Sequence, residues 1–130
     1  MKHVNPFSTL STETVKAATS LQNRIKGFCR RGKSKEENIS YFTFEQFVKK
    51  LGEHPVCHIT TCPINLLDID SWVLDHIVPV SKGGDNSIDN CGLCLKDINS
   101  IKSNLTQDQF IKACKMTLEA NGFKVVSNAD

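Results

Sequence analysis

Apolar residues in the first half of the chain recur at helical spacing. A stripe three and four residues apart predicts a helix over residues 12–29, with an apolar face of Val15, Ala18, Leu21, Ile25 and Phe28. The segment Thr43-x-x-Gln46 fits a capping box and opens a second predicted helix. Its apolar face is Phe44, Phe47, Val48 and Leu51, and Gly52 is placed to end it. Residues 32–39, which are polar and charged, predict a loop between the two helices.

The second half of the chain changes to strand patterning. Residues 72–80 and 89–95 are apolar and rich in strand-forming types, and the Gly-containing segment 81–86 separates them. Residues 96–103 can form a short helix. A second capping box, Thr106-x-x-Gln109, opens a last helix whose apolar face is Phe110, Ile111, Cys114 and Leu118, and Asn121-Gly122 ends it.

This order of elements predicts an α+β fold. A lone two-stranded hairpin is marginally stable, so helices on both sides should supply most of the core. We expect one domain over residues 1–130, with a basic helical part at 11–52, a core at 57–105 and a C-terminal helix at 106–122.

Composition excludes several protein classes. The 130 residues are 39% apolar and 23% charged, which is ordinary for a globular protein. No apolar run approaches the roughly 20 residues of a membrane span, and the first residues lack the apolar block of a secretion signal. We therefore expect a cytoplasmic protein without membrane contact.

Charge is unevenly distributed along the chain. Residues 1–50 hold 10 Lys and Arg against 4 Asp and Glu (+6), whereas residues 51–130 hold 6 against 10 (−4). Six cations and no acid fall between residues 23 and 35: Arg24, Lys26, Arg30, Arg31, Lys33 and Lys35. The cluster is either a solvated helix end or a site for a polyanion.

The most informative segment begins where the first strand ends. Asp75 directly precedes His76, and adjacent side chains of a strand point to opposite faces, so one of them must be exposed or specifically satisfied. The surrounding residues resemble the HNH nuclease family. Four elements carry the match in order: Asp75-His76-Ile77-Val78-Pro79, Lys82-Gly83-Gly84, Ser87-Ile88-Asp89-Asn90 and Asn99-x-x-Lys102.

The resemblance extends to one subgroup, the small phage-type HNH proteins. These carry a basic helix, a Phe-rich helix and a Cys-x-x-Thr segment followed by Pro-Ile. Here those segments are Cys57-His58-Ile59-Thr60 and Pro63-Ile64. A helix that begins Leu-Thr-x-x-x-Phe follows, at residues 105–110.

The resemblance implies a catalytic ββα-metal (His-Me finger) hairpin, packed against the N- and C-terminal helices, that cleaves DNA. His76 would be the general base, and Asp75 and Asn99 would be oxygen ligands of one Mg²⁺ or Mn²⁺ ion. Asn90 would hold the loop and His76 in register. Lys102, one helical turn after Asn99, would reach a phosphate oxygen beside the metal.

Double-stranded DNA is the implied partner, held by the basic cluster and by Lys82. A monomer would nick one strand and a homodimer could cut both, and the sequence leaves the two open. The alternative is a non-catalytic nucleic-acid-binding module with the same fold. A degenerate module is expected to have lost Asp75, His76 or Asn99, and all three are present.

The six cysteines allow three interpretations: disulfides, a zinc site or small core residues. The expected reducing compartment disfavours disulfides. Structural zinc could use Cys57, Cys62, Cys91 and Cys94, assisted by His54 or His58. However, Cys91 and Cys94 lie at odd spacing within a predicted strand and should face opposite sides. We favour core residues and keep zinc as the second interpretation; His54 and His58 are then surface residues of a loop.

Overall fold

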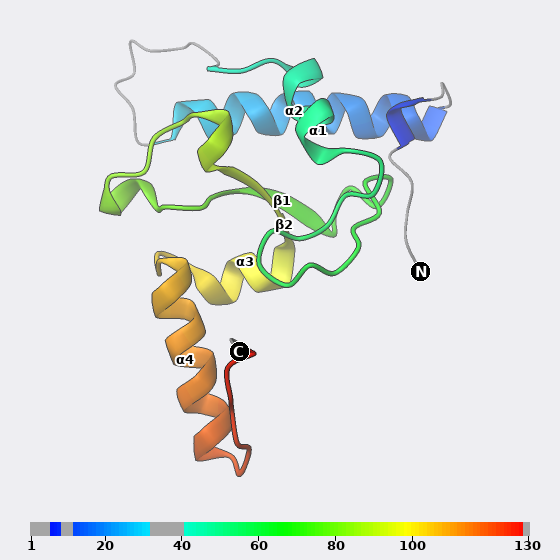
Figure 1. The fold of residues 1–130 in the computed structure, drawn as a ribbon. Coiled ribbons are helices and arrows are strands. Elements are labelled where there is room, and N and C mark those ends of the chain that lie inside the picture. The colour runs from blue at the N-terminus through cyan, green and yellow to red at the C-terminus, as the bar shows by residue number, and fades with distance from the viewer. Residues whose placement is uncertain (1–5, 9–11, 32–40, 129–130) are drawn as a thin grey trace.

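The computed structural model describes residues 6–8, 12–31 and 41–128, and they form an α+β fold (Figure 1). The α-helices are α1 (Thr12–Arg30), α2 (Phe44–Leu51), α3 (Lys96–Lys102) and α4 (Gln107–Ala120). Strands β1 (Trp72–His76) and β2 (Cys91–Leu95) form an antiparallel sheet. Short 3₁₀ turns lie at Pro6–Ser8, Val80–Lys82 and Ile88–Asn90. No helix among the described residues has the length and hydropathy needed to cross a membrane.

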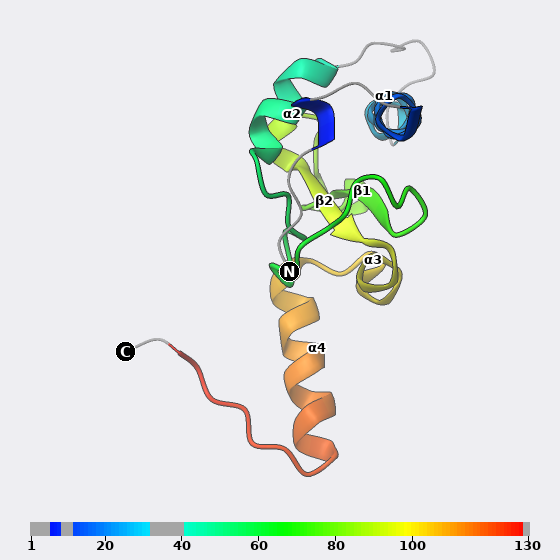
Figure 2. The same ribbon diagram turned by 90° about the vertical axis from the view of Figure 1, so that its right-hand side faces the viewer.

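The hairpin is the middle layer of the fold. Helices α1 and α2 lie on one side of it and α3 on the other (Figures 1 and 2). The core between these layers is built from large apolar side chains that include Leu21, Phe28, Phe47, Trp72 and Leu93. The helices therefore supply much of the core, as the marginal stability of a lone hairpin predicts.

Both strands are shorter than the sequence predicts. β1 ends at His76, four residues early, and β2 begins at Cys91, two residues late. The amide side chain of Asn90 bonds both backbone groups of Val78, so this stretch pairs with a side chain instead of a strand. Pro79 then prevents any further ladder, because it has no N–H to donate.

The apolar face of α1 is rotated at its first turns. Thr14 and Ala17 are buried there, whereas Val15 is 54% exposed, so the predicted stripe is correct only from Leu21 onward. The two stripes meet at Leu21 because spacings of three and four are both compatible with 3.6 residues per turn. The pattern alone does not choose between them.

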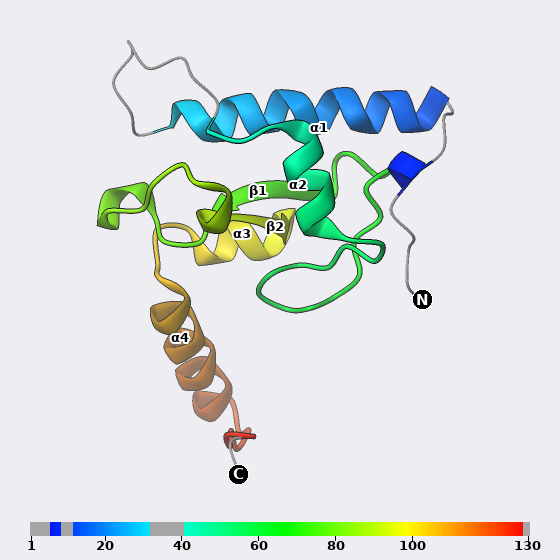
Figure 3. The same cartoon turned by 45° about the horizontal axis from the view of Figure 1, so that its top comes forward.

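Helix α4 projects away from the hairpin (Figures 1 and 3). Its capping box at Thr106 and Gln109 forms as predicted, but Phe110 is its one buried residue. The expected packing of Ile111, Cys114 and Leu118 against the hairpin is wrong, since all three are exposed. Capping is local and needs no partner, whereas burial needs a surface, and α4 leaves the body after its first turn.

Candidate active site

A pocket of about 310 Å³ opens where β1 ends. Asp75 and His76 are the last two residues of β1, and Asn99 reaches the same pocket from α3, which directly follows β2. The other residues that line it include Arg31, Pro79, Ser103 and Asn104. The hairpin and the following helix thus bring together the three residues that the motif singles out.

The Asp75 carboxylate is buried and held by two donors. Its Oδ2 atom lies 3.0 Å from Nε2 of His58 and 3.2 Å from Nζ of Lys102. Lys102 is fully enclosed, and its Nζ atom also lies 3.4 Å from the backbone oxygen of His76. The predicted reach of Lys102 to a phosphate is therefore not what the structure shows, because the ammonium group faces inward and binds β1.

His76 is oriented by an amide and a ring. Its Nε2 atom lies 2.7 Å from Oδ1 of Asn86, and the Asn86 Nδ2 atom donates to the Cys29 carbonyl at 2.8 Å. The imidazole also stacks on Phe28, with ring centroids 3.8 Å apart. An amide oxygen only accepts, so Nε2 carries the proton and Nδ1 keeps its lone pair.

The environment of His76 favours the neutral imidazole. Burial lowers its pKa below 6.5, and the charge of Arg31 acts in the same direction, against the opposing effects of the Asn86 hydrogen bond and of Asp75. The neutral form is the one that can accept a proton. Asp75 and His76 are thus both buried, and each makes hydrogen bonds to a different set of partners.

Asn90 fixes the loop that follows β1. Its Oδ1 atom accepts from the Val78 N–H at 2.8 Å, and its Nδ2 atom donates to the carbonyls of Val78 (3.1 Å) and Asp85 (2.8 Å). A Cβ atom on Gly84 would lie 1.7 Å from that Val78 oxygen, so the chain approaches itself closely here. Asn90 acts on the backbone and holds the loop beside His76.

A comparison with known protein families matches residues 57–107, which contain this site, to the family described as HNH endonuclease. This segment belongs to the HNH endonuclease family. No curated protein and no solved structure matches the chain. The HNH segment spans the hairpin, its loop and α3, so the pocket residues come from it, apart from Arg31, which directly follows α1.

The pocket at the end of β1, called the HNH pocket from here on, offers oxygen donors that suit a hard divalent cation. Asp75 offers a carboxylate and Asn99 an amide oxygen to the same pocket. Oxygen donors of this kind, completed by water, are the usual environment of Mg²⁺ and Mn²⁺. The side chains present therefore fit the ion that the resemblance implies.

The four cysteines considered for zinc do not gather at one point. Sγ of Cys57 lies 3.8 Å from Sγ of Cys94, whereas Cys62 is exposed. Cys91 is buried elsewhere on β2, and burial raises the pKa of its thiol to about 12. Within the described ranges, no three His, Cys, Asp or Glu side chains converge as a metal site.

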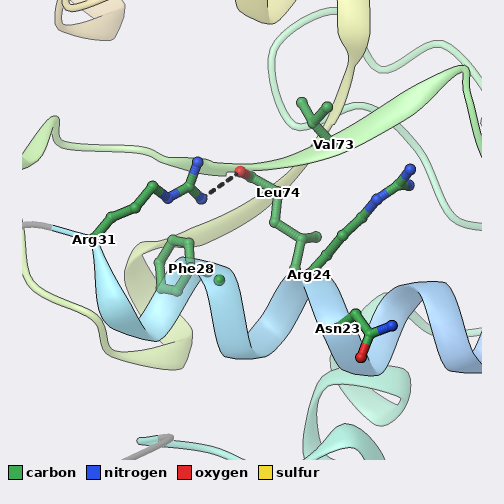
Figure 4. Close-up of a pocket in the computed structure, with 7 residues that line it drawn as sticks. Asn23, Arg24, Phe28, Arg31, Val73 and Leu74 are labelled. Atoms are coloured by element: carbon green, nitrogen blue, oxygen red, sulfur yellow. Dashed lines mark hydrogen bonds between the residues drawn. The ribbon is translucent and has the colours of Figure 1, made fainter. Parts of the chain in front are cut away.

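Two arginines of the basic cluster bind the outer edge of β1 (Figure 4). Arg24 donates to the carbonyls of Ile69 and Trp72, and its guanidinium lies 4.0 Å from the centroid of the Trp72 ring. Arg31 donates to the Leu74 carbonyl at 3.0 Å. These hydrogen bonds cap backbone acceptors that β2 does not pair, a structural role the sequence analysis did not foresee.

The other predicted DNA-binding cations lie in different surroundings. Lys26 and Arg30 are exposed on α1, and Lys33 and Lys35 fall outside the described residues. Lys82 binds the start of α4: its Nζ atom lies 2.7 Å from the Asn104 carbonyl and 2.5 Å from Oε1 of Gln109.

A second pocket, of about 450 Å³, lies between α1 and β1 (Figure 4). Arg24 and Arg31 lie at its ends, and Gly27 of α1 lies between them in the sequence. Arg31 and Leu74 line this pocket and the HNH pocket alike, so the two are adjacent.

Two residues of the site were missed in the sequence analysis. His58 was interpreted as a surface residue or an assisting zinc ligand, and Asn86 as part of the Gly-containing segment between the strands. One signal for His58 is Gly92, since a glycine inside a strand often marks a close approach by another group. Nothing in the sequence distinguishes Asn86 from an ordinary turn residue.

Proposed function

We propose that this protein is a metal-dependent DNA endonuclease of the ββα-metal type. The observation that carries the proposal is the convergence of Asp75, His76 and Asn99 on one pocket of the HNH segment. Asp75 and Asn99 would hold a single Mg²⁺ or Mn²⁺ ion. When bound, such an ion stabilises negative charge that develops on the phosphate and on the leaving oxygen.

His76 acts as the general base in this proposal. Its Nδ1 atom accepts the proton of the attacking water, while the hydrogen bond between Nε2 and Asn86 holds the ring and its tautomer. Phe28 stacks on the ring and restricts its tilt. Asn90 contributes by positioning the loop, and it does not contact the reacting atoms.

The DNA strand would enter along the groove between α1 and β1. Arg31 lines both adjacent pockets, and its guanidinium retains N–H donors beyond the bond to Leu74. Arginine binds phosphate through such donors. Lys26 and Arg30 add exposed positive charge on the same helix. Arg31 and His76 line the same pocket, so a phosphate held by Arg31 would lie beside the proposed base.

A plasmid assay tests the proposal. Supercoiled DNA incubated with the protein and Mg²⁺ should be nicked or linearised, and EDTA should abolish the reaction. His76→Ala should lower the rate by about 10²–10⁴-fold, as expected for loss of a general base. Asp75→Ala and Asn99→Ala should weaken both cleavage and metal binding.

His54→Ala is the matched control, because His54 is an exposed loop histidine of the same protein. Its rate should equal that of the wild type. If the wild-type protein binds DNA but cleaves none with Mg²⁺ or Mn²⁺, the alternative of a non-catalytic module replaces this proposal. The ratio of nicked to linear product reports whether one strand or both are cut.

A further inference from the structure

His58 contacts the proposed metal ligand from outside the sheet. It lies in the turn that precedes β1, and its Nε2 atom donates to Oδ2 of Asp75 at 3.0 Å. The side chain is partly buried, with 14% of its surface exposed. His58 stands at a position that the Cys-x-x-Thr pattern of the resemblance leaves unspecified.

The backbone fixes the position of His58. Val56 pairs with Pro63 in an isolated bridge, and the Cys57 N–H donates to the Cys62 carbonyl at 2.9 Å, which closes the turn. The N–H of His58 itself donates to the Leu93 carbonyl of β2 at 2.8 Å. The turn is therefore attached to the sheet at the residue that carries the imidazole.

Strand β2 leaves room for this imidazole. Gly92 is the register partner of Asp75 in the hairpin. A Cβ atom on Gly92 would lie 2.5 Å from the His58 ring, closer than carbon atoms can approach. The ring thus occupies the space that a side chain at position 92 would take, next to the carboxylate.

Both donors to Asp75 bind the same oxygen. His58 and Lys102 approach Oδ2 from different elements, at 3.0 and 3.2 Å. Two donors on one oxygen fix the rotation of the carboxylate about its last bond. The other oxygen, Oδ1, is then available to the pocket that Asp75 and Asn99 line.

We propose that His58 is a positioning residue that fixes the Asp75 carboxylate so that Oδ1 is presented to the divalent ion. This inference rests on the proposed function, in which Asp75 is a ligand. Residues that orient a metal ligand typically contribute about 10–100-fold to metal affinity or activity.

Titration of the DNA-free protein with Mn²⁺, followed by calorimetry, tests the inference directly. His58→Phe retains a ring but has no N–H, and it should bind Mn²⁺ about 10–100-fold more weakly than the wild type. His58→Gln keeps an N–H donor and should recover much of that loss. His54→Ala should bind Mn²⁺ like the wild type.

Cleavage gives a second readout. His58→Phe should require a higher Mg²⁺ concentration for half-maximal rate, and its rate at saturating Mg²⁺ should return toward that of the wild type. A purely structural role would instead lower the rate at every Mg²⁺ concentration and would not distinguish Gln from Phe. Gly92→Ala, which displaces the ring, should behave like His58→Phe.

The outcomes separate the two proposals. Wild-type Mn²⁺ affinity in His58→Phe overturns the role of His58 and leaves the proposed function intact. Equal affinities of the Gln and Phe variants, both weakened, also overturn it. A wild-type protein that neither binds Mn²⁺ nor cleaves DNA overturns the proposed function, and this inference with it.

Discussion

Substitution of Asn90 by Ala should destabilise the folded protein even when neither metal nor DNA is bound. The side chain makes three hydrogen bonds to backbone groups of the loop after β1. Each such bond contributes roughly 0.5–1.5 kcal/mol net. Val78, which takes part in two of them, is 44% exposed, so water can replace some of the lost partners. We therefore expect a loss of about 2–3 kcal/mol in the free energy of unfolding.

Equilibrium unfolding in urea, with EDTA present, measures this loss. Trp72 is the chain's single tryptophan and is fully buried, so its fluorescence reports the transition. Asn90→Asp retains the acceptor for the Val78 N–H but sets a carboxylate oxygen against the carbonyls of Val78 and Asp85, so it should be no more stable than Asn90→Ala. Asn104→Ala, at an exposed asparagine, should change stability by less than about 0.5 kcal/mol.

One result would refute the reasoning. If Asn90→Ala unfolds at the same urea concentration as the wild type but cleaves DNA at least about 10²-fold more slowly, a loss on the scale of a removed acid–base group, Asn90 acts at the reacting atoms. Its three backbone hydrogen bonds would then be incidental to its role.

Three further predictions concern the loop, His76 and α1. Gly84→Ala should cost at least ~2 kcal/mol because its Cβ would overlap a carbonyl, whereas Gly27→Ala, with open space around it, should gain ~0.5–1 kcal/mol; urea unfolding of both variants checks this. The folded state lowers the pKa of His76, so the unfolded state binds its proton first. Stability of the metal-free protein should therefore fall as the pH drops through about 6.5, and less so in His76→Gln. Replacing Lys26 and Arg30 by Gln should reduce the log–log salt slope of DNA affinity by about two units if each contacts one phosphate. An unchanged slope would show that neither side chain contacts a phosphate.

Local signals in the sequence predict the elements of this fold well. Both capping boxes form, at Thr43 and Thr106, because a cap is made within four residues of chain. The resemblance to the HNH motif likewise predicts the hairpin and the short helix after it. The ends of the strands do not, because they depend on the amide of Asn90, which sequence patterns cannot orient.

Contacts between distant segments could not be predicted. The sequence does not show that α4 leaves the body, because an apolar stripe looks the same whether or not a surface meets it. Likewise, the bond between His58 and Asp75 joins residues 17 positions apart through a turn whose path had no periodic signal. The motif identified the chemical groups, and the structure supplies the residues that orient them.

Helix α1 divides the basic cluster into two roles. Arg24 donates to the carbonyls of Ile69 and Trp72, whereas Arg31 makes one bond to the Leu74 carbonyl and keeps further N–H donors for the proposed phosphate contact. Lys26 and Arg30 face outward. The matched segment, residues 57–107, carries three Lys and Arg against six Asp and Glu, so its own net charge of −3 repels DNA. Because Phe28 of α1 also stacks on His76, the helix that would attract DNA in the proposed function packs directly against the proposed base. In the proposed function, α1 therefore connects the charge that would bind DNA to the residue that would act as the base.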